Sequence, residues 1–292
     1  MAFFSHVRKA MDSRNGKLVI LAMVLAAVLA WAHISPAGGG LVVEALDVGQ
    51  GDAILITTPH GRRVLIDGGP GQSVLRELGA TMPFLSRKID VMALTHPHAD
   101  HVDGLVPVIR RYDVGQLMVT GVTYPNAAYT ALLKSARAPS LYGYPYLTLA
   151  DDDRDFVLDG VTFDILYPFE PLLGDTISNV NNSSVVIMVR YGDHRILLTG
   201  DAEIEEEAEL VEAHDRGEID LRADVLKAGH HGSRTSSTPE FLERVNPEVA
   251  IISSGNGNSY GHPHAETLEM FERLGIEVRR TDREGRVRLE FR

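Results

Sequence analysis

The segment from His96 to His101 constrains the fold of this chain more than any other part of it. Its sequence is HPHADH, and it directly follows the apolar run Val91–Thr95, which has the composition of a buried strand. Residues two apart in an extended segment point the same way, so His96 and His98 can bind one ion. Asp100 and His101, at the start of the next helix, can turn toward a second ion about 3.5 to 4 Å away. A solvated loop is the alternative, but so dense a cluster at a strand end favours paired metal sites.

A second strand end carries a carboxylate. The apolar run 197–199 is followed by Gly200 and Asp201. A glycine lets the backbone approach closely, and a carboxylate at a strand end can bridge two cations, so Asp201 is the candidate for a ligand shared by both ions. Asp201 can also be the N-cap of the helix predicted for residues 202–214, and the two roles do not exclude each other.

The third strand end, residues 227–233 with the sequence KAGHHGS, contains two adjacent histidines. One of them, His230 or His231, is expected to complete the shell of the second ion. The chain has no cysteine, so thiolate zinc sites, cysteine nucleophiles and disulfides are excluded together. Any metal must therefore be held by histidine, aspartate or glutamate.

The overall charge limits the possible partners. Lys and Arg total 28 against 40 Asp and Glu, a net charge of −12, while 44% of the residues are hydrophobic, as in an ordinary globular protein. An acidic chain does not coat nucleic acid through a broad basic face. A metal site that binds a phosphate group locally remains compatible with this charge.

Residues 1–36 are expected to lie outside the folded domain. Four basic residues precede the uncharged run 18–32, which is followed by small residues, in the order of a secretory signal peptide. The run also approaches the length of about 17 residues at which a helix can span a bilayer, so an uncleaved single transmembrane anchor is the alternative to cleavage, and a buried core helix is a weaker one. Positive charge before the run predicts that residues 37–292, the remaining domain, lie outside the cytoplasm, secreted, periplasmic or anchored to the outer face of the membrane.

Strands and helices alternate after residue 41. Short β-rich runs separated by turns fill residues 41–66, and strands alternate with helical patterns as far as the last strands of the chain. Helices are expected at 101–112, 124–137, 202–214, 239–245 and 265–274. This order suits one α/β domain in which two mixed sheets pack face to face and helices cover them outside, an αββα sandwich.

The motifs in this order resemble those of the metallo-β-lactamase-fold hydrolases. The finer set is closest to the extracytoplasmic hydrolase domain of the DNA-uptake competence protein ComEC, and it consists of LDVGQGD at 46–52, LIDGG at 65–69, LTHPHADHVDGL, NNSSVV, LLTGD, LKAGHHGS and NSYGHPHAETLEMF. The resemblance covers nearly everything after residue 40. It implies the αββα metallo-β-lactamase fold, with a cleft for two divalent metal ions, Zn or Mn, at one edge.

Carried onto this sequence, the resemblance also implies individual roles. The implied metal ligands are His96 and His98 for the first ion, Asp100, His101 and His230 for the second, Asp201 as the bridge, and Asp67 as a carboxylate that orients the histidine loop. His230 is preferred to His231 because it follows the strand and Gly229, as the last ligand does in the wider superfamily.

The chain departs from the superfamily at one ligand position. Many members have a histidine before the TGD strand that completes the first metal shell, whereas this chain has Asn181, Asn182 and Ser183 there. Asn182 is the hypothetical replacement. An amide oxygen is a harder and weaker ligand than imidazole, so the first site is expected to exchange metal readily or to favour Mn²⁺ over Zn²⁺.

Several further residues are candidates for catalysis. His262 and His264 in GHPH are predicted to act as a general acid or to bind phosphate, against the alternative of an ordinary loop. His231 and Lys227 are given the same two alternatives, and Asp100 is counted as catalytic as well as a ligand. The acidic run from Glu203 to Glu207 is interpreted as a solvated helix face.

These residues together predict an exported dinuclear metal-dependent hydrolase. Two cations can lower the pKa of a shared water and stabilise the charge that develops at an ester centre, which suits a phosphodiester. The leading expectation is a phosphodiesterase or nuclease that acts on DNA or nucleotides, as in ComEC-like DNA uptake. The alternatives are hydrolysis of a carbon ester, lactone or β-lactam, or a non-catalytic binding module of an envelope assembly. The membrane is an expected partner only if residues 1–36 stay uncleaved, and no stable protein partner is evident.

Overall fold

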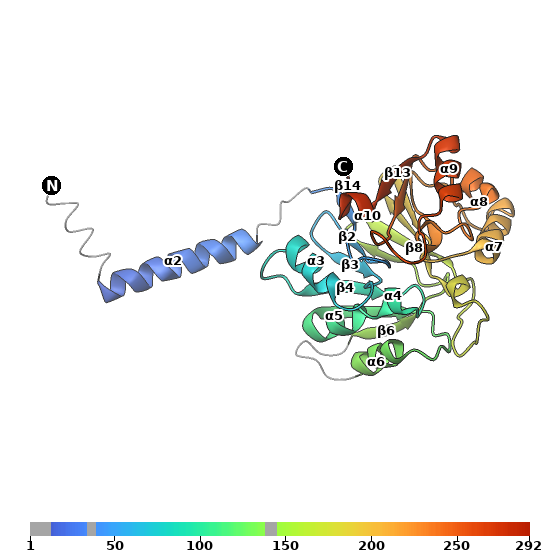
Figure 1. Ribbon diagram of the computed structural model, residues 1–292. Helices are drawn as coiled ribbons and strands as arrows, with labels where there is room; N and C mark the ends of the chain where they lie inside the picture. Colours follow the sequence, from blue (N-terminus) through green and yellow to red (C-terminus); the bar gives the residue numbers. More distant parts are fainter. Residues whose placement is uncertain (1–12, 34–38, 138–144) are drawn as a thin grey trace.

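The computed structural model describes residues 13–33, 39–137 and 145–292. Two seven-stranded sheets lie face to face, and helices cover their outer sides (Figure 1). Each sheet contains both parallel and antiparallel neighbours. The predicted αββα sandwich with two mixed sheets is therefore confirmed.

The first sheet has the order β14-β1-β2-β3-β4-β5-β6. The neighbours from β14 to β3 pair antiparallel, and those from β3 to β6 pair parallel. The last strand of the chain thus completes the sheet that the first strand begins. The strands are β1 (Leu41–Ala45), β2 (Ile54–Thr57), β3 (Arg63–Ile66), β4 (Lys88–Ala93), β5 (Asp113–Val119), β6 (Tyr146–Leu149) and β14 (Val287–Phe291).

The second sheet has the order β13-β12-β11-β10-β9-β8-β7. Strands β7 to β10 pair antiparallel, and β10 to β13 pair parallel, so the two sheets have the same mixed plan. Its strands are β7 (Phe156–Leu158), β8 (Val161–Tyr167), β9 (Val186–Tyr191), β10 (His194–Leu198), β11 (Val225–Lys227), β12 (Val249–Ile252) and β13 (Glu277–Arg280).

The helices fall into two sets that cover different sheets. Apolar side chains of α3, α4, α5 and α6 pack on the first sheet, and those of α7, α8 and α9 pack on the second. The helices are α2 (Arg14–His33), α3 (Ser73–Thr81), α4 (Ala99–Val102), α5 (Leu105–Arg111), α6 (Ala127–Ala136), α7 (Ile204–Asp215), α8 (Pro239–Val245), α9 (Ala265–Leu274) and α10 (Thr281–Glu284), with short 3₁₀ turns η1 (Val180–Ser183) and η2 (Gly229–Gly232).

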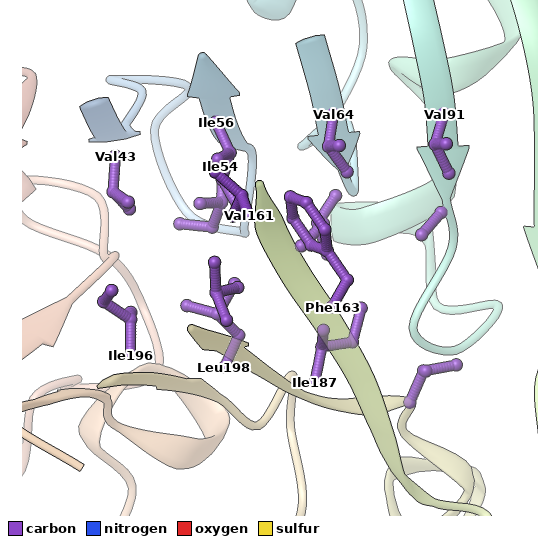
Figure 2. Packing of buried hydrophobic residues seen from close by; sticks show 14 of the residues in the cluster. Val43, Ile54, Ile56, Val64, Val91, Val161, Phe163, Ile187, Ile196 and Leu198 are labelled. Carbon is purple, nitrogen blue, oxygen red and sulfur yellow. The ribbon is translucent and has the colours of Figure 1, made fainter. Parts of the chain in front are cut away.

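An apolar core fills the space between the two sheets. Figure 2 shows side chains of β1, β2, β3 and β4 meeting those of β8, β9 and β10, with the Phe163 ring at the centre. These side chains are aliphatic or aromatic and almost entirely buried, so their removal from water is the main favourable contribution to folding. This core fixes the two sheets and thereby the strand ends that carry the polar motifs.

The strand ends gather the motifs at one edge of the sandwich. In the second sheet Leu198 pairs with Lys227, and Lys227 pairs with Ile251, so the parallel strands β10, β11 and β12 end side by side. In the first sheet β3 and β4 end together at Ile66 and Ala93. Since parallel strands deliver their carboxyl ends to the same edge, the segments that follow these strands meet there.

The helix predicted for residues 101–112 is interrupted. It is divided into α4 and α5, and at the division the Gly104 N–H donates to the Gly69 carbonyl at 2.9 Å instead of to a carbonyl of the helix. Gly104 lies so close to Gly68 that a Cβ at position 104 would be 1.9 Å from the Gly68 oxygen. This contact joins the loop after β3 to the start of α5. A second hydrogen bond, from the Gly68 N–H to the His101 carbonyl at 2.8 Å, joins the same loop to the histidine segment.

The N-terminal segment forms a helix in its described part. Residues 14–33 are helical, and several of its apolar side chains are more than half exposed, including Leu18, Leu21 and Met23. Of the helices within residues 13–33, 39–137 and 145–292, none meets the combined length and apolarity needed to cross a membrane. Residues 1–12 and 34–38 of the predicted signal peptide or anchor lie outside the described residues, and that assignment stays a prediction.

Candidate metal centre

One carboxylate oxygen, Asp201 Oδ2, lies among four imidazoles. The Nε2 atoms of His101 and His231 are 3.2 and 3.3 Å from it, and those of His96 and His230 are both 3.9 Å from it. Asp201 itself is buried, with 1% of its surface exposed. A carboxylate in this position can be shared between two ions, as the sequence predicted for Asp201.

The nearer pair of histidines belongs to a compact group of possible ligands. Asp100, His101, Asp201 and His231 each offer one ligand atom, and these atoms lie within 4.8 Å of one another. His101 Nε2 and Asp201 Oδ1 are buried without a hydrogen-bond partner among the described residues. Buried polar atoms are nearly always satisfied, so the unsatisfied nitrogen and oxygen suit a divalent cation that binds both.

The other two predicted ligands face each other. His96 Nε2 is 3.1 Å from His98 Nδ1, and His96 is completely buried, whereas His98 is partly exposed. The hydroxyl oxygens of Thr95 and Ser184 lie 3.2 and 3.4 Å from His96 Nδ1. They fix the His96 ring so that its Nε2 is directed at His98 and Asp201.

Hydrogen-bond acceptors hold three more imidazoles at Nδ1, the ring nitrogen that does not face Asp201. The Nδ1 atoms of His101, His231 and His230 donate to a carboxylate, a carbonyl and a carboxylate respectively. The pairs are His101 with Asp67 Oδ2 at 2.8 Å, His231 with the Ser253 carbonyl at 3.0 Å, and His230 with Glu203 Oε1 at 2.6 Å. An acceptor at one ring nitrogen leaves the other free to bind metal and fixes the tautomer, as is common at metal-bound histidines.

Asp67 also fixes the backbone of the histidine segment. Its carboxylate accepts hydrogen bonds from the Thr95 N–H at 2.8 Å and the Thr95 hydroxyl at 2.7 Å, in addition to the bond from His101. Asp67 has a positive φ of 60°, which is unusual for a residue other than glycine. This backbone conformation directs the carboxylate toward the histidine segment, which is the orienting role that the resemblance implied for Asp67.

The electrostatics of the centre favour protons or cations. Burial disfavours the charged form of His101, but the carboxylates of Asp201 and Asp67 outweigh it and raise the pKa of His101 well above its ordinary value. Burial is likewise outweighed for His231, where Asp201 and Asp52 raise the pKa well above the ordinary value. The same imidazoles hold the pKa of Asp201 well below its ordinary value despite its burial. Without a metal ion, the imidazoles therefore hold the protons, and their positive charge offsets that of the ionised carboxylates.

His96 has the opposite character. Burial, followed by repulsion from His101, lowers the pKa of His96 well below its ordinary value. His96 is consequently a neutral imidazole at neutral pH. A neutral ring with a free Nε2 is the form that binds a metal ion.

A buried cation lies beside the carboxylates. Lys227, with 1% of its surface exposed, pairs with Asp52 and donates to the Gly200 carbonyl at 2.8 Å. Its Nζ is also 3.7 Å from Asp201 Oδ1. Lys227 was predicted either to be catalytic or to be an ordinary loop residue. In the structure it contacts the backbone at Gly200 and the carboxylates of Asp52 and Asp201.

The GHPH loop, called the rim below, places His262 beside His230 and His264 beside His262. The ring centroid of His262 is 5.2 Å from that of His230 and 4.8 Å from that of His264. Burial, followed by repulsion from His230 and His231, lowers the pKa of His262 to about 4. His262 is therefore neutral at pH 7 and suits hydrogen bonding to a substrate better than the predicted role of general acid. His264 Nδ1 accepts from the Arg234 N–H at 3.1 Å, which leaves its Nε2 available.

An exposed aromatic ring extends this rim. The ring of Tyr260 is stacked on His262, with centroids 5.8 Å apart and an interplanar angle of 28°, and 66% of Tyr260 is exposed. Asn258 Oδ1 accepts from the N–H groups of Tyr260 and His262, at 3.1 and 3.0 Å. Asn258 thereby holds the loop in which both rings lie.

For two expected ligands, His230 and Asn182, the structure gives different neighbours from those that the sequence suggested, and their roles at a metal stay predictions. His231, and not His230, joins Asp100, His101 and Asp201, because His230 is turned toward Glu203. The sequence could not predict which of the two adjacent histidines points toward Asp100. Their directions depend on a rare left-handed backbone conformation that both residues adopt, with φ of 42° and 56°.

Asn182 does not face the histidines. Its Oδ1 accepts from the Glu203 N–H at 2.9 Å and its amide donates to Glu205 at 2.8 Å, so it binds the start of α7. The residue of this stretch that does reach the centre is Ser184, whose hydroxyl accepts from the Asp201 N–H at 3.0 Å. The N-cap alternative for Asp201 is also wrong, because α7 begins at Ile204 and its N-cap is Glu203.

The acidic run before and within α7 is only partly a solvated face, because Glu205 is exposed whereas two other glutamates are buried. Glu206 and Glu207 are both 1% exposed, and Glu207 accepts from the N–H groups of Ser237 and Thr238. Burial raises the pKa of both glutamates. Sequence reasoning missed the role of Glu203 for the same reason, because a run of glutamates in a helix is typical of solvent-exposed surface.

The comparison with known families agrees with this geometry. The profile of the metallo-β-lactamase superfamily matches residues 46–255, which contain every residue of the centre described above except the rim loop 256–264. The chain belongs to the metallo-β-lactamase superfamily. Members of this superfamily bind divalent metals, often two, and the strand-end histidines and aspartates of this chain are candidate ligands.

The relatives of this chain include a protein named for competence. The chain is 33% identical over 269 residues to ComE operon protein 3 of Bacillus subtilis (86% of this chain, 33% of that protein). It is 31% identical over 247 residues to Competence protein ComA of Neisseria gonorrhoeae (83% and 31%). The chain thus spans about a third of the length of these two relatives. Among solved structures, CmlA, a diiron β-hydroxylase from Streptomyces venezuelae, has a TM-score of 0.54 at 16% identity (88% and 55%), and this shows the shared fold.

Proposed function

We propose that this superfamily member is an exported phosphodiesterase with two divalent metal ions, acting on DNA or nucleotides as part of DNA uptake. The observation that carries the proposal is the arrangement around Asp201, whose Oδ2 is surrounded by four imidazole Nε2 atoms. A binding module has no use for unsatisfied buried nitrogen and oxygen atoms at such a point. The kinship with a protein named for competence supports the substrate class.

The residues present divide into binding and orienting groups. Divalent cations at such a centre lower the pKa of water and stabilise negative charge that develops on a phosphate. Asp67, Ser253 and Glu203 orient the imidazoles, and Lys227 offsets the charge of Asp52. These hydrogen bonds hold the groups in place before a substrate binds, which is the preorganisation that stabilisation of developing charge requires.

The rim provides contacts for the substrate. His264 Nε2 and the neutral ring of His262 can donate hydrogen bonds to a phosphate oxygen, and Tyr260 offers an aromatic face beside them. A phosphodiester between two nucleosides has both an anionic centre and a flat base next to it. This pairing favours nucleic acid over a lactone or β-lactam, which lacks the second feature.

The proposal is tested with one panel of substrates. The purified chain, with Mn²⁺ or Zn²⁺ added, is assayed on single- and double-stranded DNA, RNA, bis(p-nitrophenyl) phosphate, a lactone and a β-lactam. Phosphodiester cleavage that falls more than about 100-fold in Asp201→Asn supports the proposal, since loss of a ligand exceeds the effect of an orienting group. Cleavage of only the carbon esters or the lactam would replace it by the alternative hydrolase, and no hydrolysis with two bound metals would favour a binding module.

A further inference from the structure

The loop between α3 and β4, loop 82–88, holds two large apolar side chains out into the solvent. Phe84 is 84% exposed and Leu85 is 54% exposed. The loop is tied to the first sheet, because the Ser86 hydroxyl accepts from Arg63 Nη1 at 2.9 Å. Exposed apolar residues that occur singly need no explanation, but an adjacent pair on a loop held in this way indicates a contact with an apolar partner.

Basic side chains lie beside this apolar pair. Four of them are exposed at the same edge of the first sheet, namely Arg62, Arg87, Lys88 and Arg111. The Arg87 guanidinium lies 5.5 Å from the centre of the Tyr112 ring, and Arg111 directly precedes that tyrosine in the chain. The last strand-side residues of the loop and the end of α5 thus place their positive charges close together. The loop therefore has an apolar tip with exposed cations next to it.

Carboxylates near the loop leave this positive charge open to the solvent. Asp90, which Arg62 and Lys88 contact at 2.8 and 3.6 Å, is itself buried, while 52% and 56% of those two side chains remain exposed. Asp113 and Asp159 are partly buried. The charge presented to solvent beside the loop is therefore mainly positive, although the chain as a whole carries −12. A local excess of this kind favours an anionic partner.

Loop 82–88 lies at the edge of the first sheet opposite the metal centre, because it precedes β4 whereas the histidine segment follows β4. Strand β1 begins at this same edge. Val42 pairs with Thr57, and Thr57 pairs with Arg63, the first residue of β3, which runs parallel to β4. The eight peptide units between the end of α2 and the start of β1 span at most about 28 Å. The helix α2, with its exposed apolar side chains, is therefore attached to the edge that carries the loop.

A lipid bilayer suits this surface better than a second protein does. A stable protein interface buries about 800 Å² on each partner, and two neighbouring side chains on one loop provide much less. Attachment to a membrane instead sums weak contributions, and one apolar segment becomes a firm anchor when a second apolar or basic element is added. The exposed cations match the negative headgroups of an anionic bilayer, where each basic residue near the surface adds to binding.

We propose that loop 82–88 binds the surface of an anionic lipid bilayer. Phe84 and Leu85 enter the layer of headgroups, and the four cations beside them contact lipid phosphates. The domain is then oriented with its metal centre away from the lipid, where a substrate in the water can reach it. The proposal concerns this surface alone, so it does not depend on which ester the metal centre hydrolyses or on whether α2 spans the membrane.

The test places a fluorescent reporter on the loop of the full chain. The chain has no cysteine, so Phe84→Cys provides a single site for the environment-sensitive label nitrobenzoxadiazole. The control label is at Leu173→Cys, an exposed apolar residue whose loop bonds to Gly121, beyond the carboxyl end of β5 and so at the edge of the metal centre. Both proteins contain α2, so binding through α2 affects both alike.

The two labels are expected to respond differently to lipid. With vesicles of phosphatidylcholine and phosphatidylglycerol, emission from the label at position 84 should shift to shorter wavelength and be quenched by brominated lipid. The label at position 173 should keep the emission that it has in water.

Charge variants of the labelled protein test the headgroup contacts. Arg87→Glu with Lys88→Glu is expected to weaken the lipid-dependent response at position 84 by about tenfold or more in a titration with anionic vesicles. Arg273→Glu with Arg283→Glu makes the same change of charge at exposed positions elsewhere and should leave the response unchanged.

Three results would overturn the proposal. The first is an equal response of the two labels, and the second is an equal response at position 84 to neutral phosphatidylcholine vesicles. The third is a shift at position 84 that appears without lipid and grows with protein concentration, which would assign the loop to a contact between copies of the chain.

Discussion

Lys227 and Asp52 form an ion pair inside the protein, with 1% and 2% of their surfaces exposed. Burial opposes the charge on Lys227, but Asp52 and Asp201 outweigh it and raise the pKa of the ammonium group. Lys227 Nζ also donates to the carbonyl of Gly200, the residue before Asp201. The pair therefore joins β11 to the loop after β1 and fixes the backbone that presents the shared carboxylate.

Removing one partner of this pair is expected to destabilise the protein strongly. Lys227→Met removes the lysine partner of the buried Asp52 and leaves it with His231 as its nearest cation, and breaking a buried pair in this way costs about 3–5 kcal/mol of unfolding free energy. The double variant Lys227→Met with Asp52→Asn should lose less than the sum of the single variants by about 1 kcal/mol or more. Urea unfolding of metal-free protein measures all three variants. Additive losses would show that the two residues are not coupled.

The sequence predicted some helices of the domain with the correct boundaries and missed some of its strands. Helices Pro239–Val245 and Ala265–Leu274 have the predicted boundaries, because apolar periodicity and the flanking turn or capping residues agree there. The edge strand β6 and the strand β5 were not predicted. Their burial depends on parallel neighbours far away in sequence, and a short run such as β5, with a glycine inside it, carries little local signal.

The centre shows the same division between local and long-range information. Four ligand candidates in the HPHADH segment and Asp201 could be predicted, because each lies at the end of a strongly apolar strand. The choice between His230 and His231, and the role of Glu203, could not, since they depend on left-handed backbone angles and on contacts across loops. The close approach predicted at Gly200 is confirmed: a Cβ there would be 2.9 Å from Thr95 Cβ.

Tyr260 is expected to distinguish nucleic acid from small phosphodiesters. Stacking of a base on an aromatic ring contributes about 1–3 kcal/mol, so Tyr260→Ala should raise KM for single-stranded DNA by about 5- to 100-fold. The same variant should leave hydrolysis of a small dialkyl phosphodiester nearly unchanged, because that substrate has no aromatic ring to stack on Tyr260. Tyr260→Trp retains an aromatic face and should restore KM, and Tyr146→Ala, at another exposed tyrosine, is the control. Equal losses on both substrates would mean that Tyr260 acts on the loop and not on a base.

Export is expected from the charge before the apolar run. Arg8, Lys9, Arg14 and Lys17 precede residue 18 and should keep the N-terminus in the cytoplasm. Alkaline phosphatase fused after residue 40 should then be active, and its activity should fall when the four basic residues are replaced by glutamate. A fusion that is inactive, while a cytoplasmic reporter at the same place is active, would put the domain inside the cell.

Metal affinity is expected to rise with pH, because cations must displace protons from the centre. The pKa values of His101 and His231 are raised well above their ordinary value of 6.5, chiefly by Asp201 against the effect of burial, so both rings are protonated at neutral pH in metal-free protein. Without metal, these protonated rings stabilise the fold fully below pH 6.5, and this contribution is lost as pH rises through the raised values. Binding of metal requires neutral rings and should tighten by up to about tenfold per pH unit for each proton displaced. Competition with a chelator between pH 6 and 9, corrected for protonation of the chelator, measures the slope, and proton release in calorimetry checks it. An affinity independent of pH would show that neither histidine is a ligand.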